Sequence, residues 1–214
     1  MSIDWALIRL KATAEYLQLV EEIKPVQGFL LDLQGYTLML LAEEGPGAGS
    51  IVEIGSFMGK STCWLARGAK RAQREKVYAI DPFTGSPEHQ SGGICEVSVI
   101  AEDGSTFPMF EQNIRALGVL EQVVPIVARS EDAARDWHGP IRLLFIDGDH
   151  SYEASKLDFD LWSPFVVPGG IIVFHDIGEW EGVTRFYNEH VITDPRYKQL
   201  LNLYSMCVVV KSAS

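Results

Sequence analysis

Residues 51–62 read IVEIGSFMGKST, a short apolar run followed by two glycines, Gly55 and Gly59. An apolar run before glycines and a helix-forming stretch predicts a buried strand that turns into a helix. In an open parallel sheet, such a turn places backbone N–H groups at the crevice where ligands bind. The stretch therefore predicts an α/β fold with a ligand site at the carboxyl end of its first strand.

The rest of the core repeats this alternation of apolar runs and helical stretches. Runs such as LLFI at 143–146 and IIVF at 171–174 lack polar alternation, so both faces of their strands should be covered. We therefore predict a Rossmann-like, doubly wound, mostly parallel sheet with helices on both faces. The closely spaced strands at 197–203 and 206–211 predict an antiparallel hairpin at the C-terminus. The other strands are expected at 51–54, 76–80, 123–127, 142–146 and 170–174, and helices at 60–71, 106–117, 131–137, 152–164 and 181–190.

Two more helices are expected before the first strand, at 4–23 and 31–44. Two helices in about 45 residues cannot bury a core of their own, so they should dock onto the rest of the chain. We predict one domain over residues 1–214, in which 1–45 form a helical cap or lid and 50–214 form the Rossmann-like core.

The stretch 82–105 is long, polar and rich in glycine. A connection of this length within a compact domain favours a functional lid, although a disordered insertion has the same composition. Together with the N-terminal helices, this stretch would cover an acceptor pocket. The candidate aromatic walls of that pocket are Trp5, Tyr36, Phe83, Phe107, Trp180 and Tyr187, each of which also suits a core position.

The composition excludes several classes of protein. The chain has 18 Lys+Arg against 29 Asp+Glu and a net charge of −11, which argues against a nucleic-acid partner because phosphate binding needs clustered basic residues. The first residues carry an acid, Asp4, where a secretory leader would carry positive charge, so we expect no leader, and no apolar stretch approaches the roughly 20 residues that span a membrane. We expect a cytoplasmic protein without a membrane partner. The N-terminal helix could pair between subunits, so a homo-oligomer is possible.

Two other nucleotide-binding motifs compete for the glycine loop. GKST at 59–62 resembles the end of a phosphate-binding P-loop, but that loop needs four residues between its glycines and this one has three. Ile54 stands where the first glycine belongs, and its side chain does not tolerate the required backbone shape. The GxGxxG of nicotinamide dehydrogenases is absent because Phe57 and Met58 interrupt it. A nucleotide hydrolase or a non-catalytic ligand-binding domain remains the remote alternative.

An S-adenosylmethionine loop fits the stretch better. Glu53 then ends the strand, and the loop passes beneath the methionine part of the cofactor. Asp81 closes the next strand, VYAID, where a carboxylate can accept hydrogen bonds from both ribose hydroxyls. An Asp before Pro82 also caps turns. Ser130 suits either a contact to adenine or the N-cap of the helix after it.

Two acidic clusters follow neighbouring strands, LLFIDGDH at 143–150 and IVFHDIG at 172–178. The carboxyl ends of parallel strands face one crevice, so the clusters should meet there. Carboxylate oxygens suit a hard divalent cation, and a histidine ligand shifts the preference toward manganese, iron or zinc. Asp147 and Asp176 are the minimum pair of ligands, and His150 is free to act as a general base. The same acids can instead cap helices and hold His150 structurally.

Four strings, VEIGSFMGKST, VYAIDPF, LLFIDGDHSYE and VPGGIIVFHDIG, occur in this order. They resemble a class I S-adenosylmethionine-dependent methyltransferase. More closely, they resemble the metal-dependent O-methyltransferase group that includes catechol O-methyltransferase, macrocin O-methyltransferase and the cephalosporin hydroxylase-like proteins. The resemblance covers about residues 25–190. It implies a seven-stranded sheet whose last strand is antiparallel.

The resemblance also implies the reaction and its residues. It implies methyl transfer from S-adenosylmethionine to a hydroxyl of a small molecule such as a sugar or polyphenol, assisted by Mg²⁺, Mn²⁺ or another divalent metal. A metal-independent O-methyltransferase or an N-methyltransferase is the alternative. Asp147, His175 and Asp176 fall on metal-ligand positions, with His in place of a carboxylate, and His150 falls on the catalytic base, which is Lys in the catechol enzymes. The cofactor-binding positions are Glu53, Gly55, Ser56, Gly59, Ser61, Asp81, Ser130 and Asp147.

Overall fold

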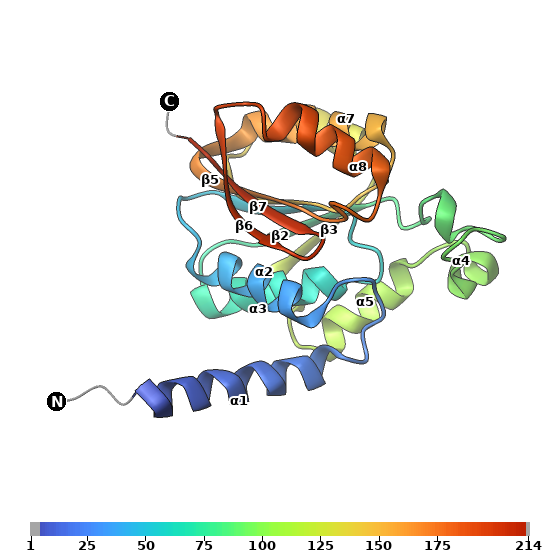
Figure 1. Cartoon of the computed structure of the whole chain (residues 1–214). Helices are drawn as coiled ribbons and strands as arrows, with labels where there is room; N and C mark the ends of the chain where they lie inside the picture. The colour runs from blue at the N-terminus through green and yellow to red at the C-terminus, as the bar shows by residue number, and fades with distance from the viewer. Residues whose placement is uncertain (1–4, 213–214) are drawn as a thin grey trace.

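A central seven-stranded sheet with helices on both faces forms the body of the molecule (Figure 1). The computed structural model describes the backbone of residues 5–212 and the side chains of residues 12–100 and 102–212. The strand order is β3-β2-β1-β4-β5-β7-β6, and β7 is antiparallel to both of its neighbours while the other pairs are parallel. The predicted doubly wound, mostly parallel sheet with an antiparallel C-terminal hairpin is confirmed.

The expected elements are found within a few residues of their predicted bounds. The strands are β1 (Ser50–Ile54), β2 (Val77–Asp81), β3 (Val123–Val127), β4 (Ile141–Ile146), β5 (Val166–Phe174), β6 (Tyr197–Leu203) and β7 (Met206–Lys211). The helices are α1 (Trp5–Ile23), α2 (Asp32–Glu44), α3 (Lys60–Ala72), α4 (Ser98–Asp103), α5 (Phe107–Ala116), α6 (Ser130–Arg135), α7 (Tyr152–Trp162) and α8 (Glu181–Phe186). Helix α4 and the short turn Pro87–His89 lie within the stretch 82–105, where the sequence analysis predicts no element.

The core lies in two layers, one on each face of the sheet. Successive side chains of a strand point to opposite faces, so β4 sends Leu143 and Phe145 to one layer and Leu144 and Ile146 to the other. The first layer is closed by α2, α3 and α5 together with the end of α1, and the second by α6, α7 and α8. This arrangement explains why the strands read as continuous apolar runs.

The N-terminal segment docks through α2. Gly35 of α2 lies against the indole of Trp64 on α3, where a Cβ would stand 2.1 Å from the ring nitrogen. Leu38, Met39 and Ala42 of α2 are fully buried in the core. Helix α2 therefore belongs to the helical layer beside α3. Figure 1 shows α1 at the edge of the molecule, below α3, and Leu19 and Ile23 of α1 are buried in this layer.

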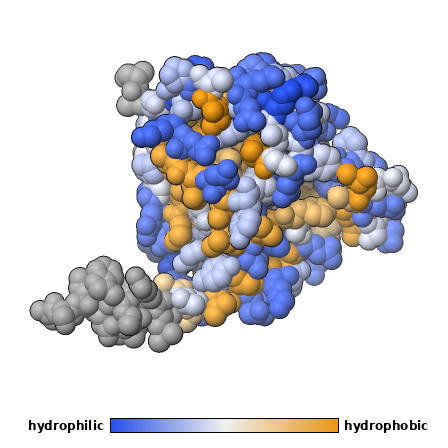
Figure 2. All heavy atoms as spheres, in the orientation of Figure 1, coloured by the Kyte–Doolittle hydropathy of each residue, from blue (hydrophilic) through white to orange (hydrophobic). Residues whose placement is uncertain are grey.

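The surface carries an open sheet edge at β6. Leu200 and Leu201 of this strand are 54% and 40% exposed. Figure 2 shows hydrophobic residues interspersed with hydrophilic ones on the face that carries β6 and α2. No helix within residues 5–212 has both the length and the hydropathy that crossing a membrane requires. The expected homo-oligomer stays a prediction.

Candidate active site

A cavity of about 920 Å³ opens at the carboxyl ends of the parallel strands. Its size is within the range of small-molecule sites, and its position at this edge of an open α/β sheet is the one expected for a ligand. Residues Gly28–Leu30, from the connection between α1 and α2, contribute to its wall, as do Thr84–Gln90 of the stretch 82–105. The lid roles of 1–45 and 82–105 stay predictions. Of the predicted site residues, Gly55, Ser56, Ser61, Asp81, Ser130, Asp147, His150, His175 and Asp176 line the cavity.

Glu53, a predicted cofactor contact, lies beneath the glycine loop and does not line the cavity. One of its oxygens, Oε2, accepts hydrogen bonds from the hydroxyls of Ser56, at 2.8 Å, and Thr62. The other, Oε1, is buried without a hydrogen-bond partner. Burial raises the pKa of Glu53 to about 7. The residue supports the loop from below, which corrects its predicted position.

The two glycines of the loop each leave room for a different neighbouring group. A Cβ on Gly55, which has φ +87°, would stand 2.0 Å from the carbonyl oxygen of Asp147, because the ends of β1 and β4 lie side by side. Gly59, also with φ +87°, precedes α3, and a Cβ there would meet the ring of Phe110 at 3.0 Å. Gly59 therefore leaves room for Phe110 of α5; it does not line the cavity, and its role beside the cofactor stays a prediction.

Asp81 combines the two roles that the sequence left open. Its Oδ1 accepts a hydrogen bond from the backbone N–H of Phe83, as in a turn cap, and its Oδ2 accepts one from the N–H of Phe57 at 2.8 Å. Burial raises the pKa of the carboxyl. The carboxyl also faces the cavity, where each oxygen keeps acceptor capacity for a ligand hydroxyl. Asp81 thus fixes the loop and presents an acceptor beside it.

Asp147, His175 and Asp176 form a compact cluster whose potential ligand atoms all lie within 4.8 Å of one another. The Nδ1 atom of His175 is 3.1 Å from Asp147 Oδ1 and 3.2 Å from Asp176 Oδ1. Burial disfavours the charged imidazole, but the two carboxylates outweigh it and raise the pKa of His175 to about 11. Burial alone would raise the pKa of Asp176, whereas hydrogen bonds from His150 and His175 hold it below its ordinary value.

Gln34 of α2 orients His175, and no sequence motif indicated this residue. The amide nitrogen of Gln34 donates to Leu203 O and Ser205 Oγ, each at 3.2 Å, so its oxygen faces His175 Nε2 at 3.1 Å. His175 Nε2 must then carry the hydrogen, and its Nδ1 is directed at the two carboxylates. One imidazole nitrogen and two carboxylates, with an amide fixing the tautomer, are a donor set that suits a divalent metal. The cluster therefore fits the metal that the resemblance implies.

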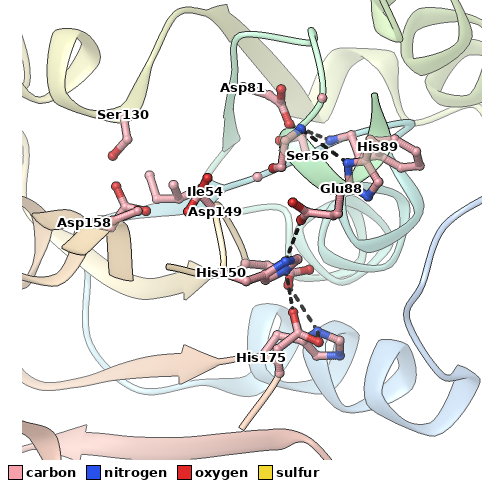
Figure 3. Close-up of a pocket in the computed structure, with 18 of the residues that line it drawn as sticks. Ile54, Ser56, Asp81, Glu88, His89, Ser130, Asp149, His150, Asp158 and His175 are labelled. Atoms are coloured by element: carbon pink, nitrogen blue, oxygen red, sulfur yellow. Dashed lines mark hydrogen bonds and ion pairs between the residues drawn. The ribbon is translucent and has the colours of Figure 1, made fainter. Parts of the chain in front are cut away.

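His150 lies between two carboxylates (Figure 3), and its role as a general base stays a prediction. Its Nε2 lies 2.9 Å from Asp176 Oδ2, and its Nδ1 lies 2.6 Å from Oε1 of Glu88, which comes from the stretch 82–105. The ring stacks on Trp180 with centroids 4.5 Å apart. Burial opposes protonation, but the hydrogen bond to Asp176 outweighs it and raises the pKa of His150.

Aromatic rings from three separate loops meet at the wall of the cavity. His89 stacks against Phe29 and Phe57, with ring centroids 5.6 Å and 5.1 Å apart. The sequence analysis did not predict this group, because its members are far apart in the chain. Of the aromatic walls that it did predict, Trp180 lines the cavity, and Tyr36, Phe83, Phe107 and Tyr187 are not among the lining residues. The side chain of Trp5 is outside the described residues.

Ser130 is the first residue of α6, one position earlier than predicted. Arg129 takes the N-cap position, so the prediction that Ser130 caps this helix is wrong. The Ser130 hydroxyl instead accepts a hydrogen bond of 2.8 Å from the indole nitrogen of Trp162 on α7. Its place in the cavity wall keeps it available to a bound ligand.

The geometry agrees with comparisons to known proteins. Residues 52–177 match the sequence profile of a family described as a methyltransferase domain. The chain belongs to this methyltransferase domain family. The matched segment holds the glycine loop, Asp81, His150 and the cluster of Asp147, His175 and Asp176.

Solved structures with the same fold are O-methyltransferases. The O-methyltransferase NovP superposes with a TM-score of 0.68 at 16% identity, covering 84% of this chain and 79% of its own. An O-methyltransferase from Bacillus cereus, in complex with S-adenosylhomocysteine, superposes with a TM-score of 0.63 at 21% identity, covering 92% and 90%. The chain therefore shares the fold of these two O-methyltransferases, as the resemblance implies.

A protein of Acanthamoeba polyphaga mimivirus, R132, is 30% identical over 131 residues. The match covers 60% of this chain, and the chain spans about half, 52%, of the viral protein.

Proposed function

We propose that this methyltransferase transfers a methyl group from S-adenosylmethionine to a hydroxyl of a small molecule, with the help of a divalent metal. The observation that carries the proposal is that one cavity joins the glycine loop and Asp81 to the cluster of Asp147, His175 and Asp176, with His150 between them. Cofactor-binding and acceptor-activating groups therefore share one wall. The S-adenosylhomocysteine in the similar Bacillus cereus structure supports the choice of cofactor.

In this proposal the residues of the loop hold the methionine and ribose parts of the cofactor. Gly55, Ser56 and Ser61 line the cavity beside the end of β1. Asp81 offers its remaining acceptor capacity to the ribose hydroxyls. Glu53 acts from beneath by holding the Ser56 and Thr62 hydroxyls.

Asp147, His175 and Asp176 would hold the metal, which when bound lowers the pKa of the acceptor hydroxyl and orients it. The methyl carbon forms a bond to the hydroxyl oxygen while its bond to sulfur breaks, leaving a neutral thioether. The hydroxyl proton passes to the neutral form of His150, which the raised pKa of the ring restricts to higher pH. Glu88 and Asp176 then stabilise the imidazolium that forms, because their carboxylates lie 2.6 Å and 2.9 Å from its nitrogens.

The walls of the cavity exclude water from the reacting atoms and shape the acceptor site. Trp180 covers one face of His150, and the rings of Phe29, Phe57 and His89 form an apolar wall. This supports a small acceptor with an apolar face. We infer that 82–105, which supplies Glu88 and His89, and the connection between α1 and α2, which supplies Phe29, act as the lids.

The proposal is tested by calorimetry and by product formation. The purified chain should bind S-adenosylhomocysteine, and Mn²⁺ should bind in a stoichiometry of about one that Asp176→Asn abolishes. A panel of catechols, flavonoids and sugars should yield a methyl ether together with S-adenosylhomocysteine, and chelator should stop the reaction. Absence of binding to S-adenosylhomocysteine would refute the proposal. Activity that persists in chelator would support the methyltransferase activity but refute the role of the metal.

A further inference from the structure

Asp158 is a buried carboxyl at the end of the cavity away from His175 (Figure 3). It comes from the second turn of α7, is 6% exposed, and lines the cavity. Burying a carboxyl away from water is costly unless it finds hydrogen-bond donors. A buried carboxyl that faces a cavity is therefore expected to have a donor, either in the protein or in a ligand.

The protein supplies one such donor, the hydroxyl of Ser130, which Figure 3 shows directed toward Asp158. An indole nitrogen only donates, so Trp162 makes Ser130 Oγ an acceptor and leaves the Ser130 hydrogen for the carboxyl. Within residues 12–212, no backbone N–H donates to Asp158. A carboxylate has about four acceptor positions, so most of its capacity remains unused.

The surroundings of Asp158 favour a flat group that donates hydrogen bonds. Burial, together with the nearby acids Glu131 and Asp149, raises the pKa of Asp158 to about 6, although the Ser130 hydroxyl opposes this rise. An ionised carboxyl here gains from any donor that a ligand brings. Ile54 and Ile80 contribute apolar surface to the same cavity, against which the faces of a planar heterocycle can pack.

The order of groups along the cavity matches the order of parts in the cofactor. The strand order β3-β2-β1-β4-β5 places Ser130, which follows β3, on one side of Asp81, which ends β2, and places His150 and His175, which follow β4 and β5, on the other side. With the ribose at Asp81 and the sulfonium toward His150, the nucleobase is left at Ser130 and Asp158. Adenine carries an exocyclic amino group, which is a donor, whereas hypoxanthine carries an acceptor oxygen at the same position.

We propose that Asp158, oriented by Ser130, accepts a hydrogen bond from the exocyclic amino group of adenine and so selects an adenosyl cofactor over its deaminated, inosyl form. The inference rests on the proposed function, because it assumes that S-adenosylmethionine occupies the cavity. A site that hydrogen-bonds a ligand donor rejects an analogue that presents an acceptor in its place, because both groups are then left unsatisfied.

The test is calorimetric titration with S-adenosylhomocysteine and with S-inosylhomocysteine at pH 7.5. The wild-type protein should bind the adenosyl compound about 100-fold more tightly or better. In Asp158→Asn, the side-chain amide can serve either base, so the preference should fall to within about 3-fold while binding is retained. Retained binding shows that the variant is folded.

Glu131→Gln is the matched control, because Glu131 lines the same end of the cavity. It should keep the wild-type preference. A preference that survives in Asp158→Asn, or that disappears in Glu131→Gln instead, overturns the assignment of Asp158. A wild-type protein that binds both compounds equally also overturns it and leaves the proposed function standing. A wild-type protein that binds neither overturns the proposed function itself.

Discussion

Replacing Glu53 with Gln should stabilise the fold relative to the wild-type protein. This gain in stability should be larger at neutral pH than at acidic pH. Glu53 is fully buried, and its Oε1 has no hydrogen-bond partner. The glutamine keeps an oxygen that can accept from Ser56 and Thr62, as Oε2 of Glu53 does. The substitution therefore removes an ionisation while preserving most of the packing.

The magnitude follows from the pKa. Burial raises the pKa of Glu53 from 4.5 to about 7, and one pKa unit corresponds to about 1.4 kcal/mol. Between these two pKa values the unfolded chain releases the Glu53 proton while the folded chain keeps it, so the free energy of unfolding falls as the pH rises. The whole fall amounts to roughly 3 kcal/mol and is complete above the folded-state pKa. The glutamine variant lacks this fall.

The assay is urea unfolding of the two proteins without cofactor, at a series of pH values from about 5 to about 8. The difference in unfolding free energy should grow in favour of Glu53→Gln by up to about 3 kcal/mol. In thermal unfolding this corresponds to a gain of about 6–12 °C for a domain of this size. Glu121→Gln, at an exposed position, is the control for removing one negative charge. Parallel pH curves for wild type and Glu53→Gln would refute the reasoning.

Three further changes test the site. His150→Ala should lower kcat by roughly 10²–10⁴ and leave binding of S-adenosylhomocysteine within about 3-fold; unchanged turnover would exclude His150 as the base. Gly55→Ala should lower the free energy of unfolding in urea by more than about 2 kcal/mol, because its φ is +87° and the added Cβ would meet a carbonyl oxygen. Gly118→Ala is the control: its φ is +63° and the added Cβ would meet open space, so the loss should be only about 1–2 kcal/mol. Gln34→Leu should weaken Mn²⁺ binding by about 10–100-fold in calorimetry and spare S-adenosylhomocysteine binding; equal loss of both would point to general unfolding.

The sheet and its strands could be predicted, although not the strand order, because apolar runs without polar alternation are typical of strands that are covered on both faces. The strands 123–127, 197–203 and 206–211 match their predicted bounds. Helix α4 was missed because six residues are too few to establish a helical period. The start of β5 was set four residues too late, since Pro168 and the glycines after it read as a turn.

The site was predicted as far as its motifs follow strand ends. Asp81, Asp147 and Asp176 share one crevice because topology alone brings strand ends together. Contacts that depend on loops or on the side of a helix left no local pattern. Gln34 and Asp158 read as ordinary polar positions of helices, and only packing shows that they are buried beside the cavity.

The hydrogen bond between Gln34 and His175 joins α2 to the residue that follows β5. Detaching α2 would expose Leu38 and Met39 and would release His175 in the same event. The cluster of Asp147, His175 and Asp176 would then lose its geometry when α2 detaches. In native-state hydrogen exchange, the amides of α2 and of the end of β5 should therefore exchange with the same opening free energy. The helical cap and the core would then unfold together rather than as separate units.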